Sequence, residues 1–214
     1  MAPPGCNKDD HPNYWFDTET AVSFDQSTHK TTFKCRIEGI PRPQYRNFAT
    51  IKSSSKKVKL WNASTPNQTA FADAFKAAVS KAKASFPESD DHPVFVSVKF
   101  FFPHPKKHFF HNPHTKQLHL HAHAPTYVTK TPDIDNCIKL ILDSLQKIIC
   151  KNDSQVANLQ ATKKYDHSHT IWDETKAKTG CTLIKVVILN EHVVDETCDC
   201  ESCKHKKKTK KSSL

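Results

Sequence analysis

Three aspartates and a lysine between residues 133 and 153 are the groups best suited to chemistry in this sequence. Asp133 and Asp135 stand one residue apart, and Lys139 follows four residues after Asp135. Asp153 comes after a further apolar stretch. Carboxylate oxygens are the ligands that Mg²⁺ prefers, and Mg²⁺ keeps positions for water and phosphate. Because a lysine beside such a site can offset the charge of a phosphate, the segment indicates metal-assisted phosphoryl chemistry.

A helix separates the first two aspartates from the third. Apolar residues recur at steps of three and four, as on one helix face: Ile134, Ile138, Ile141, Leu145 and Ile148. They predict a helix over 134–149, with Pro132 and Asp133 at positions favoured at a helix start. About sixteen helical residues span about 24 Å. Asp153 can therefore join the first two aspartates only if the chain after the helix runs back along it.

Lys139 and Asp143 extend the pattern along the predicted helix. Lys139 lies on the same face as Asp135, and Asp143 lies one turn further on. Lys139 could hold the Asp135 carboxylate or stabilise charge on a phosphate, while Asp143 orients the lysine. The alternative stays open that Asp133 only caps the helix and that Lys139 and Asp143 form ordinary surface pairs.

The other apolar patterns predict the elements that must position this helix. Alternation and β-branched or aromatic residues predict strands, and spacing of three and four predicts one more helix. The predicted strands are 33–38, 58–61, 94–102, 155–165 and 181–189, and the additional helix is 67–86. Leaving aside the short strand 58–61, the order is β-α-β-α-β-β. It indicates the α+β class, with one two-layer domain built on a mixed sheet.

The chain divides into one domain and two extensions. Its 214 residues suffice for one domain with additions at the ends. We expect a polar N-terminal arm over 1–32, a folded domain over 33–190 and a tail rich in cysteine and lysine over 191–214. We expect the two ends to be partly disordered. Residues 103–130, which are rich in histidine and proline, are predicted to be an insertion in the domain.

Basic residues are concentrated in two stretches. The sequence has 32 basic and 22 acidic residues and a formal net charge of +10. Residues 33–60 carry a net charge of +7 and residues 103–130 one of +4, whereas residues 131–174 carry −2. Basic stretches around an acidic centre favour a polyanion partner with a divalent cation held beside it. Solvated surface charge is an equal alternative on charge alone.

The sequence also predicts where the protein works. No apolar run reaches the ~20 residues of a membrane span, and the polar start of the chain lacks the apolar core of a secretory signal. We therefore expect an intracellular protein without a membrane partner and, with scattered cysteines, without a disulfide framework. The end of the chain predicts nuclear localisation or a DNA tether through its lysines Lys204, Lys206, Lys207, Lys208, Lys210 and Lys211.

Two segments around the predicted helix form a specific combination. Residues 133–139 contain an Asp-x-Asp-Asn-x-x-Lys run, and residues 152–156 contain Asn-Asp-Ser-Gln ahead of a predicted strand. A Gly-x-Pro turn also follows the first predicted strand, within residues 37–43. These features resemble the RusA family of Holliday junction resolvases, which are crossover junction endodeoxyribonucleases. The resemblance covers residues 33–190. At one position the chain differs from many members of that family, which have a further aspartate where this chain has Asn152.

The resemblance implies a homodimeric, Mg²⁺-dependent endonuclease, for which Mn²⁺ can substitute. It implies resolution of four-way DNA junctions by paired phosphodiester hydrolysis, in DNA recombination and repair. Asp133, Asp135 and Asp153 match the metal-binding and catalytic acids of the family, and Lys139 matches its catalytic lysine. We expect Asp143 to orient Lys139. Contacts to the DNA backbone are expected from the basic residues Arg36, Arg42, Arg46, Lys56, Lys57 and Lys59.

Other interpretations of the sequence stay open. The main alternative is a basic nucleic-acid-binding protein with the same fold that does not cleave, although binding alone does not need three clustered acids. The histidines within 103–126 could bind a metal, but a solvated loop is favoured. Residues 16–20 look like the first motif of DEDD-type 3′–5′ exonucleases, without partner motifs downstream. A zinc-binding regulatory protein would depend on the tail residues Cys198, Cys200, Cys203 and His205.

Overall fold

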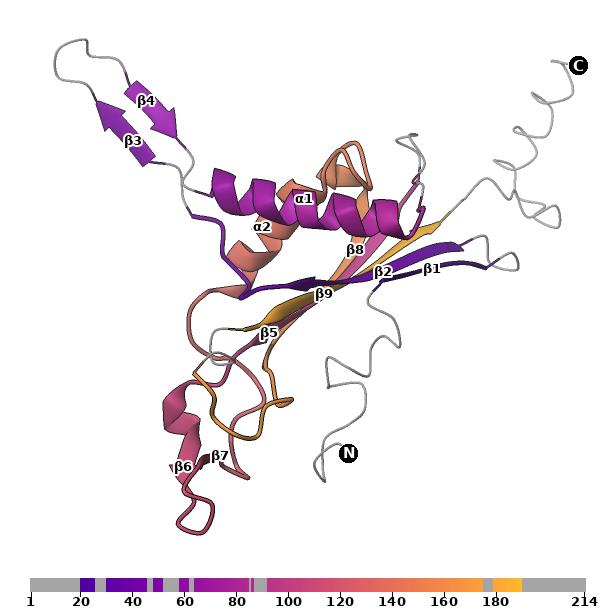
Figure 1. Ribbon diagram of the computed structural model, residues 1–214. Helices are drawn as coiled ribbons and strands as arrows, with labels where there is room; N and C mark the ends of the chain where they lie inside the picture. Colours follow the sequence, from indigo (N-terminus) through magenta and orange to yellow (C-terminus); the bar gives the residue numbers. More distant parts are fainter. Residues whose placement is uncertain are drawn as a thin grey trace, which may run out of the picture.

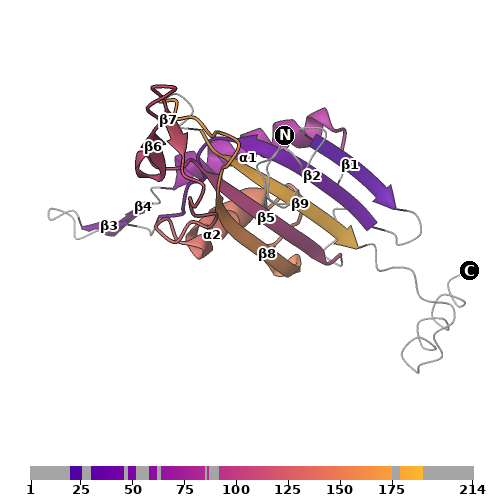
Figure 2. The ribbon, with the colours of Figure 1, turned by 90° about the horizontal axis from the view of Figure 1, so that it is seen from below.

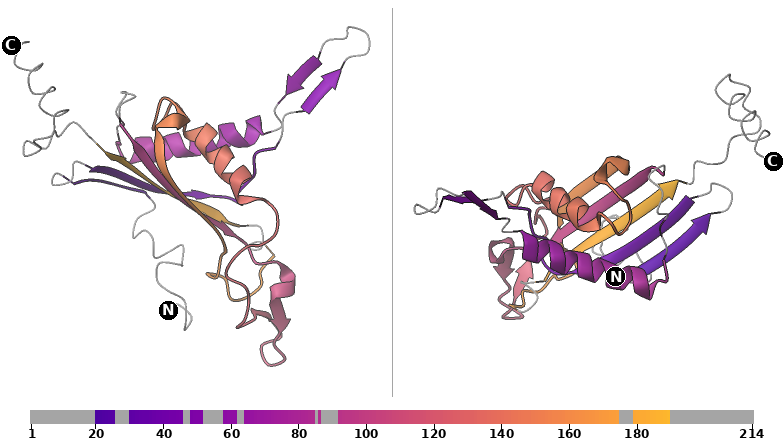
Figure 3. Two further views of the ribbon diagram at one scale, coloured as in Figure 1. Left: turned by 180° about the vertical axis from the view of Figure 1, so that it is seen from behind. Right: turned by 90° about the horizontal axis from the view of Figure 1, so that it is seen from above.

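The computed structural model describes residues 20–25, 30–45, 48–51, 58–61, 64–84, 86, 92–174 and 179–189. Within them, two helices lie on one face of a five-stranded sheet (Figures 1 and 3). The helices are α1 (Thr65–Lys81) and α2 (Ile134–Leu145). The strands, in spatial order, are β1 (Thr20–Asp25), β2 (Lys30–Glu38), β9 (Cys181–Leu189), β5 (Val94–Phe102) and β8 (Val156–Tyr165). The fold is therefore α+β with two layers and contains the predicted order of strands and helices.

The pairing of β5 and β8 determines where α2 lies. Strand β5 pairs antiparallel with β9 and parallel with β8. A parallel pair requires a crossover connection, and α2 is part of the connection between these two strands. Val94 pairs with Val156, and Phe102 pairs with Tyr165. The chain after α2 therefore runs back along the helix, and the end of β8 returns to the end of β5 from which the chain leaves toward α2.

Alternating strand residues and one face of α2 build the core. On β2, Phe33, Cys35 and Ile37 are buried toward the helices. Phe75, the buried residue of α1, packs on Phe33 in an edge-to-face arrangement with 5.4 Å between ring centroids. The buried residues of α2 are Cys137, Ile138, Leu140, Ile141, Ser144 and Leu145. Of the apolar stripe predicted from the sequence, Ile138, Ile141 and Leu145 are therefore core, whereas Ile134 is exposed. Neither helix in the described part of the chain is long and apolar enough to cross a membrane.

Two glycines shape the turn by which the chain leaves β2. Gly39 has φ 116°, a conformation that side chains disfavour, and its N–H binds the Gly180 carbonyl at 2.8 Å. A Cβ atom on Gly180 would lie 2.6 Å from the Phe101 carbonyl oxygen, so only glycine fits there without a shift of the backbone. The turn sends the chain into residues 41–45, which pass beside the start of α2 (Figure 1).

Three sequence-based predictions of element boundaries are wrong. The arm expected over 1–32 contains β1 and the first residues of β2, because β1 pairs with β2 along its whole length. Helix α1 ends at Lys81 rather than at residue 86. Helix α2 ends at Leu145 rather than at residue 149, because Lys147 turns the chain with φ 65° and its N–H binds the Cys150 carbonyl at 2.7 Å.

Two hairpins extend from the two-layer core. One consists of β3 (Phe48–Ile51) and β4 (Val58–Trp61), and the other of β6 (Phe109–His111) and β7 (Leu118–Leu120). A short 3₁₀ helix, η3 (Lys106–His108), precedes β6. The β6–β7 hairpin lies beyond one end of the sheet (Figure 2) and binds the segment after β8, since Leu120 N–H donates to the Thr170 carbonyl at 2.7 Å. The predicted insertion therefore contains an ordered hairpin instead of only a solvated loop.

Candidate functional site

Asp133 and Asp135 lie where the chain enters α2. Asp133 is the N-cap residue with an extended backbone, yet its side chain makes no capping hydrogen bond. Its carbonyl accepts a helical bond from the Cys137 N–H at 3.1 Å. Both aspartates are exposed, and the positive end of the helix favours negative charge at these positions. Their carboxylates are therefore placed to meet a cation from solvent.

Lys163, near the end of β8, lies beside the first turn of α2. Its Nζ donates to the carbonyls of Pro132 at 2.5 Å and Lys130 at 2.9 Å. Burial raises the pKa of the Cys137 thiol to about 11, with Lys163 opposing the shift and Asp135 and then Asp133 adding to it. The hydrogen bonds of Lys163 therefore bring one cation to the helix end that carries the two acids. Lys163 thereby fixes the backbone that carries Asp133.

The sequence offers a partial signal for Lys163. Ala161 and Tyr165 pack against the core under the helices, and residues two apart in a strand share a face. Lys163 therefore belongs to the face of β8 that carries α2. Local spacing does not single out Lys163 as a site residue, because the pairing of β8 with β5 that brings this position to Pro132 is not visible in it.

Lys139 is exposed and lies one helical turn after Asp135. Asp143 does not orient it, contrary to the sequence-based expectation. The Asp143 carboxylate instead accepts a hydrogen bond from Gln68 Nε2 of α1 at 3.2 Å. Among the described residues, no ion pair joins Lys139 to Asp143. Because Asp143 serves the packing of the two helices, Lys139 is left facing solvent on the same helix as the two acids.

Asp153 lies at the opposite end of α2. It begins η4 (Asp153–Gln155), a 3₁₀ turn that a capping box between Asn152 and Gln155 closes. Gln155 Oε1 also accepts the Lys151 N–H at 2.7 Å. Burial and then the charge of Asp153 raise the pKa of the Cys150 thiol, so this aspartate lies near the residues that follow the helix. Asp153 is exposed, but on a turn far from Asp133.

Helix α2 holds the three predicted metal-binding acids apart within one chain. Its twelve residues span about 18 Å at 1.5 Å each, and Asp153 precedes the strand that runs back. Across the part of the chain that the structure describes, no three His, Cys, Asp or Glu side chains are arranged to hold a metal ion. Asp133 and Asp135 nevertheless fit Mg²⁺, because this ion is usually bound by one or two carboxylates together with phosphate and water.

A cavity of about 560 Å³ opens beside Asp133. It lies between the chain after β2, the end of β5 and the start of α2. Its lining residues are Ile40, Pro41, Arg42, Pro43, Gln44, Tyr45, Phe102, Thr131, Pro132, Asp133 and Asn136. The exposed Arg42 thus belongs to the same hollow as one of the two acids, and the site combines a carboxylate, a cation and apolar walls.

The six predicted DNA-binding residues separate into four groups. Arg42 lies at the cavity, as described. Arg36 lies on the sheet face opposite the helices, since its neighbours Cys35 and Ile37 point into the core, and it forms an ion pair with Glu38. Lys59 is part of β4, but only its backbone belongs to the described part of the structure. Residues outside the described part of the chain are Arg46, Lys56 and Lys57.

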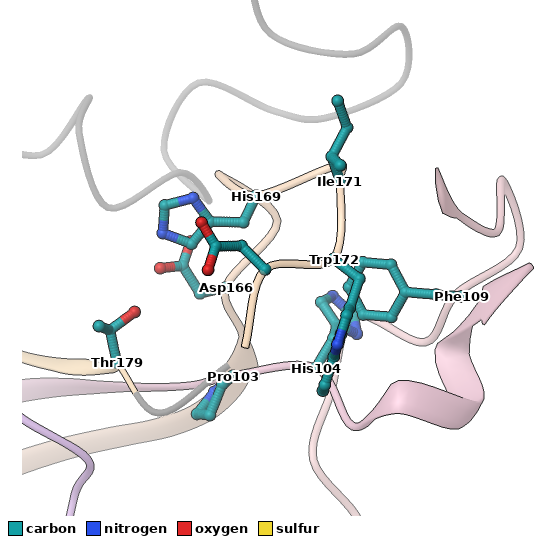
Figure 4. Close-up of a pocket in the computed structure, with 9 residues that line it drawn as sticks. Pro103, His104, Phe109, Asp166, His169, Ile171, Trp172 and Thr179 are labelled. Carbon is teal, nitrogen blue, oxygen red and sulfur yellow. The ribbon is translucent and has the colours of Figure 1, made fainter. Parts of the chain in front are cut away.

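One histidine of the histidine-rich segment, His104, is buried and used for packing. His104 is only 4% exposed, its ring stacks on Tyr165 at 4.7 Å between centroids, and its Nδ1 lies 2.9 Å from the Nδ1 of His108. Burial lowers the pKa of His104 to about 3, with the neighbouring His167 and then His108 adding to the effect. Figure 4 shows His104 beside Phe109 and Trp172 at the small hollow under the β6–β7 hairpin. A buried neutral imidazole of this kind stabilises the hairpin base.

The zinc alternative falls outside the described residues, because it depends on Cys198, Cys200, Cys203 and His205. The terminal lysines and the motif at 16–20 also lie outside them. Among the residues that the structure does describe, the histidines add no metal cluster.

Asp133 and Asp135, at the start of α2, form an exposed acidic corner. The fold and this corner define a basic α+β protein whose carboxylates suit phosphate chemistry. The family model Endodeoxyribonuclease RusA matches residues 38–171. The chain therefore belongs to the RusA endodeoxyribonuclease family. The matched range includes both ends of α2 and the cavity beside Asp133. A comparison with curated proteins found no match.

Proposed function

We propose that this protein is a Mg²⁺-dependent endonuclease that resolves Holliday junctions by paired phosphodiester hydrolysis, in DNA recombination and repair. The observation that carries the proposal is the exposed pair Asp133 and Asp135, beside Arg42 and a cavity, in a chain of the RusA family. Carboxylates next to cationic side chains suit a phosphodiester with a bound cation better than they suit simple DNA binding.

Asp133 and Asp135 would hold the Mg²⁺, or Mn²⁺ in its place. When bound, such an ion makes a water molecule more acidic and neutralises charge on the phosphate. Around it, Lys139 stabilises negative charge that develops on the phosphate oxygens, and Arg42 binds the DNA backbone. Lys163 keeps the backbone before Asp133 in place through its two carbonyl contacts. Asp133, Asp135, Lys139 and Asp153 are thus the residues proposed for catalysis.

Asp153 joins this site only if two copies of the chain come together. A two-fold axis beside α2 would set two such helices antiparallel, so that the end of one helix meets the start of the other. The partner's Asp153 would then lie next to Asp133 and Asp135, and each dimer would have two equivalent sites. A four-way junction offers two symmetric strands to cut, which suits two sites in one homodimer. The separation of the acids within one chain supports this arrangement.

The basic residues would hold the junction around these sites. Arg36, Arg42 and Arg46, with Lys56, Lys57 and Lys59, would contact phosphates and make affinity dependent on salt. The lysine-rich end of the chain would direct the protein to the nucleus or tether it to DNA.

The test is the cleavage of a synthetic four-way junction, compared with linear duplexes of the same arm sequences. We expect paired nicks on the junction in Mg²⁺ or Mn²⁺, none in EDTA, and little cutting of the duplexes. Asp135→Asn provides the matched inactive control. Tight junction binding without nicks in either metal would replace the proposal by the binding protein of the same fold. Equal cutting of the duplexes would replace it by a nuclease without junction specificity.

A further inference from the structure

The cavity beside Asp133 has a lining unlike that of a site for phosphate alone. Tyr45 is 47% exposed and lines the cavity together with Pro41, Pro43 and Pro132. Rings and proline faces offer flat apolar surface, which phosphate oxygens do not use. Phe102, 7% exposed, closes the cavity from the sheet side. A volume of about 560 Å³ lies within the range of roughly 300–1,000 Å³ that is usual for small-ligand pockets.

The segment that presents Tyr45 is fixed to both helices by hydrogen bonds. The Gln44 N–H donates to the Asn136 carbonyl of α2 at 2.9 Å. The Tyr45 N–H donates to the Oγ of Ser64, the fully buried N-cap residue of α1, at 2.5 Å. The Gln44 side chain also accepts a bond from Gln68 Nε2 at 3.3 Å. Since these contacts hold the backbone, the cavity is formed before any ligand enters.

We propose that this cavity binds one unstacked nucleobase of the DNA, next to the phosphate that is cut, with Tyr45 as its stacking platform. The inference rests on the proposed function, because it takes DNA as the ligand. Asp133 belongs to both the cavity and the acidic corner, so a nucleotide whose base fills the cavity brings its own phosphate to the acids. Arg42 supplies the cation beside that phosphate.

The chemistry of the lining matches a base that has left the helix stack. A base within duplex DNA is stacked on both faces and paired at its edge, so it cannot enter such a cavity. Near the branch point of a junction a base can unstack at lower cost, and aromatic side chains accept any base through its ring face. Gln44 and Asn136 belong to the lining, and amide groups of this kind can pair with base edges. Tyr45 would therefore help to select the cut position.

Photocrosslinking tests where the base goes. The probe is a four-way junction with 5-iododeoxyuridine at one of the two nucleotides that flank the cut phosphate, bound in Ca²⁺ to suppress cutting. The crosslink should map to Tyr45 for one of the two positions and disappear in Tyr45→Ala. Tyr127→Ala is the matched control, because Tyr127 is 57% exposed and is not part of the cavity lining. A crosslink that maps elsewhere, or that survives Tyr45→Ala, overturns the proposal.

Cleavage provides the second measurement. An abasic site at the crosslinking position and the Tyr45→Ala substitution should each lower the rate about tenfold, and together they should cost no more than either alone. Tyr45→Phe and Tyr127→Ala should stay within about twofold, because both leave a ring at position 45. Separate, multiplying losses would show that Tyr45 does not bind this base. The Tyr45→Ala variant should fold, since Tyr45 is anchored through its backbone.

The two measurements separate this inference from the proposed function. A protein that crosslinks through Tyr45 but does not cut has the base pocket without the nuclease. A protein that cuts junctions without the Tyr45 crosslink is the proposed nuclease, and the pocket assignment is wrong. Failure to bind a junction at all overturns both.

Discussion

The two ends of α2 both expose aspartates, but the chain holds them in different ways. At the start of the helix, Asp133 and Asp135 lie beside a cavity, and Lys163 fixes the backbone in front of them through two carbonyls. At the other end, Asp153 stands on a 3₁₀ turn that is closed by the side chains of Asn152 and Gln155. The start of α2 is thus supported by the lysine Lys163 and adjoins the cavity. The turn at Asp153 is held instead by a capping box.

The difference indicates that the two ends have complementary roles. The start of α2 has two acids, a cavity and nearby lysines, so it can receive both a cation and a phosphate. The other end presents a single exposed acid, Asp153, on a turn with its own internal hydrogen bonds. A turn of that kind can deliver one carboxylate to a neighbouring molecule without rearrangement. The comparison therefore predicts that each end is inactive without the other.

The largest expected effects come from removing one charge at either end. Asp135→Asn and Asp153→Asn should each lower junction cleavage by about 100-fold or more, a loss of at least about 2.7 kcal/mol of transition-state stabilisation. Junction binding should change by less than about threefold, because each substitution removes one charge from a large basic surface. Single-turnover cleavage and gel-shift binding measure the two quantities. Full activity of Asp153→Asn would leave the far end of α2 without a catalytic role.

Mixing the two variants tests whether the ends meet between chains. A dimer of one Asp135→Asn chain and one Asp153→Asn chain has one site with all acids and one site with neither Asp135 nor Asp153. Mixed protein should therefore regain cleavage, mostly as single nicks, although each variant alone is inactive. If all acids acted within one chain, both sites of the mixed dimer would be damaged, and no activity would return.

Lys139 should contribute to the rate more than to binding. Lys139→Ala should reduce cleavage by about 10- to 100-fold, because a charge that faces the phosphate is lost, while junction affinity falls by less than about threefold. Lys76→Ala is the matched control: it removes an exposed lysine from the other helix, α1, and should leave both quantities unchanged. Equal losses of rate and affinity for Lys139→Ala would make Lys139 a DNA-binding residue.

Lys163 should act through position. Lys163→Ala removes both contacts to the carbonyls before Asp133 and should lower cleavage about tenfold, since small displacements of reacting groups are costly. The Mg²⁺ concentration for half-maximal rate should rise, whereas the thermal midpoint should move little. Lys163→Gln, which keeps N–H donors, should recover part of the loss. An unchanged Mg²⁺ dependence would show that Lys163 does not position the acids.

Local pattern was enough to predict the order of α1, α2 and the sheet strands β2, β5, β8 and β9, and the position of both acidic segments relative to α2. The steps of three and four after Asp133 mark the buried face of α2, and alternation marks β2. A similar alternation occurs in Thr20–Asp25, where Ser23 separates Val22 from Phe24, but the polar surroundings favoured an arm. The predicted helices and strands were thus based on patterns within single segments of the chain.

What the sequence could not supply are contacts between distant segments. The cavity depends on Gln44 binding Asn136 and on Tyr45 binding Ser64, and the acidic corner depends on Lys163 reaching Pro132. Asp153 stays apart because the strand that runs back begins only after it. A solvated loop was favoured for the dense histidines, with metal binding as the alternative, whereas burial makes His104 a packing residue. Each of these outcomes depends on contacts between segments far apart in the sequence, which local spacing does not encode.

The smallest expected effect concerns the turn that carries Asp153. Asn152→Ala removes half of the capping box and should cost roughly 0.5–2 kcal/mol in the free energy of unfolding, as for other lost caps. Cleavage should fall only about two- to threefold, because Asp153 itself remains and is merely held less firmly. Urea denaturation and junction cleavage measure the two effects, with Asn158→Ala, an exposed asparagine on β8, as the control.

A double substitution identifies the cause of that loss. In an Asp153→Asn background, Asn152→Ala should lower stability as before but should no longer change the residual cleavage, because the carboxylate that the turn positions is already gone. A further loss of cleavage in this background would mean that Asn152 acts on the site independently, for example as a ligand in its own right. The amide oxygen of Asn152 would then belong with the acids, and the two ends of α2 would differ in their ligands as well as in their support.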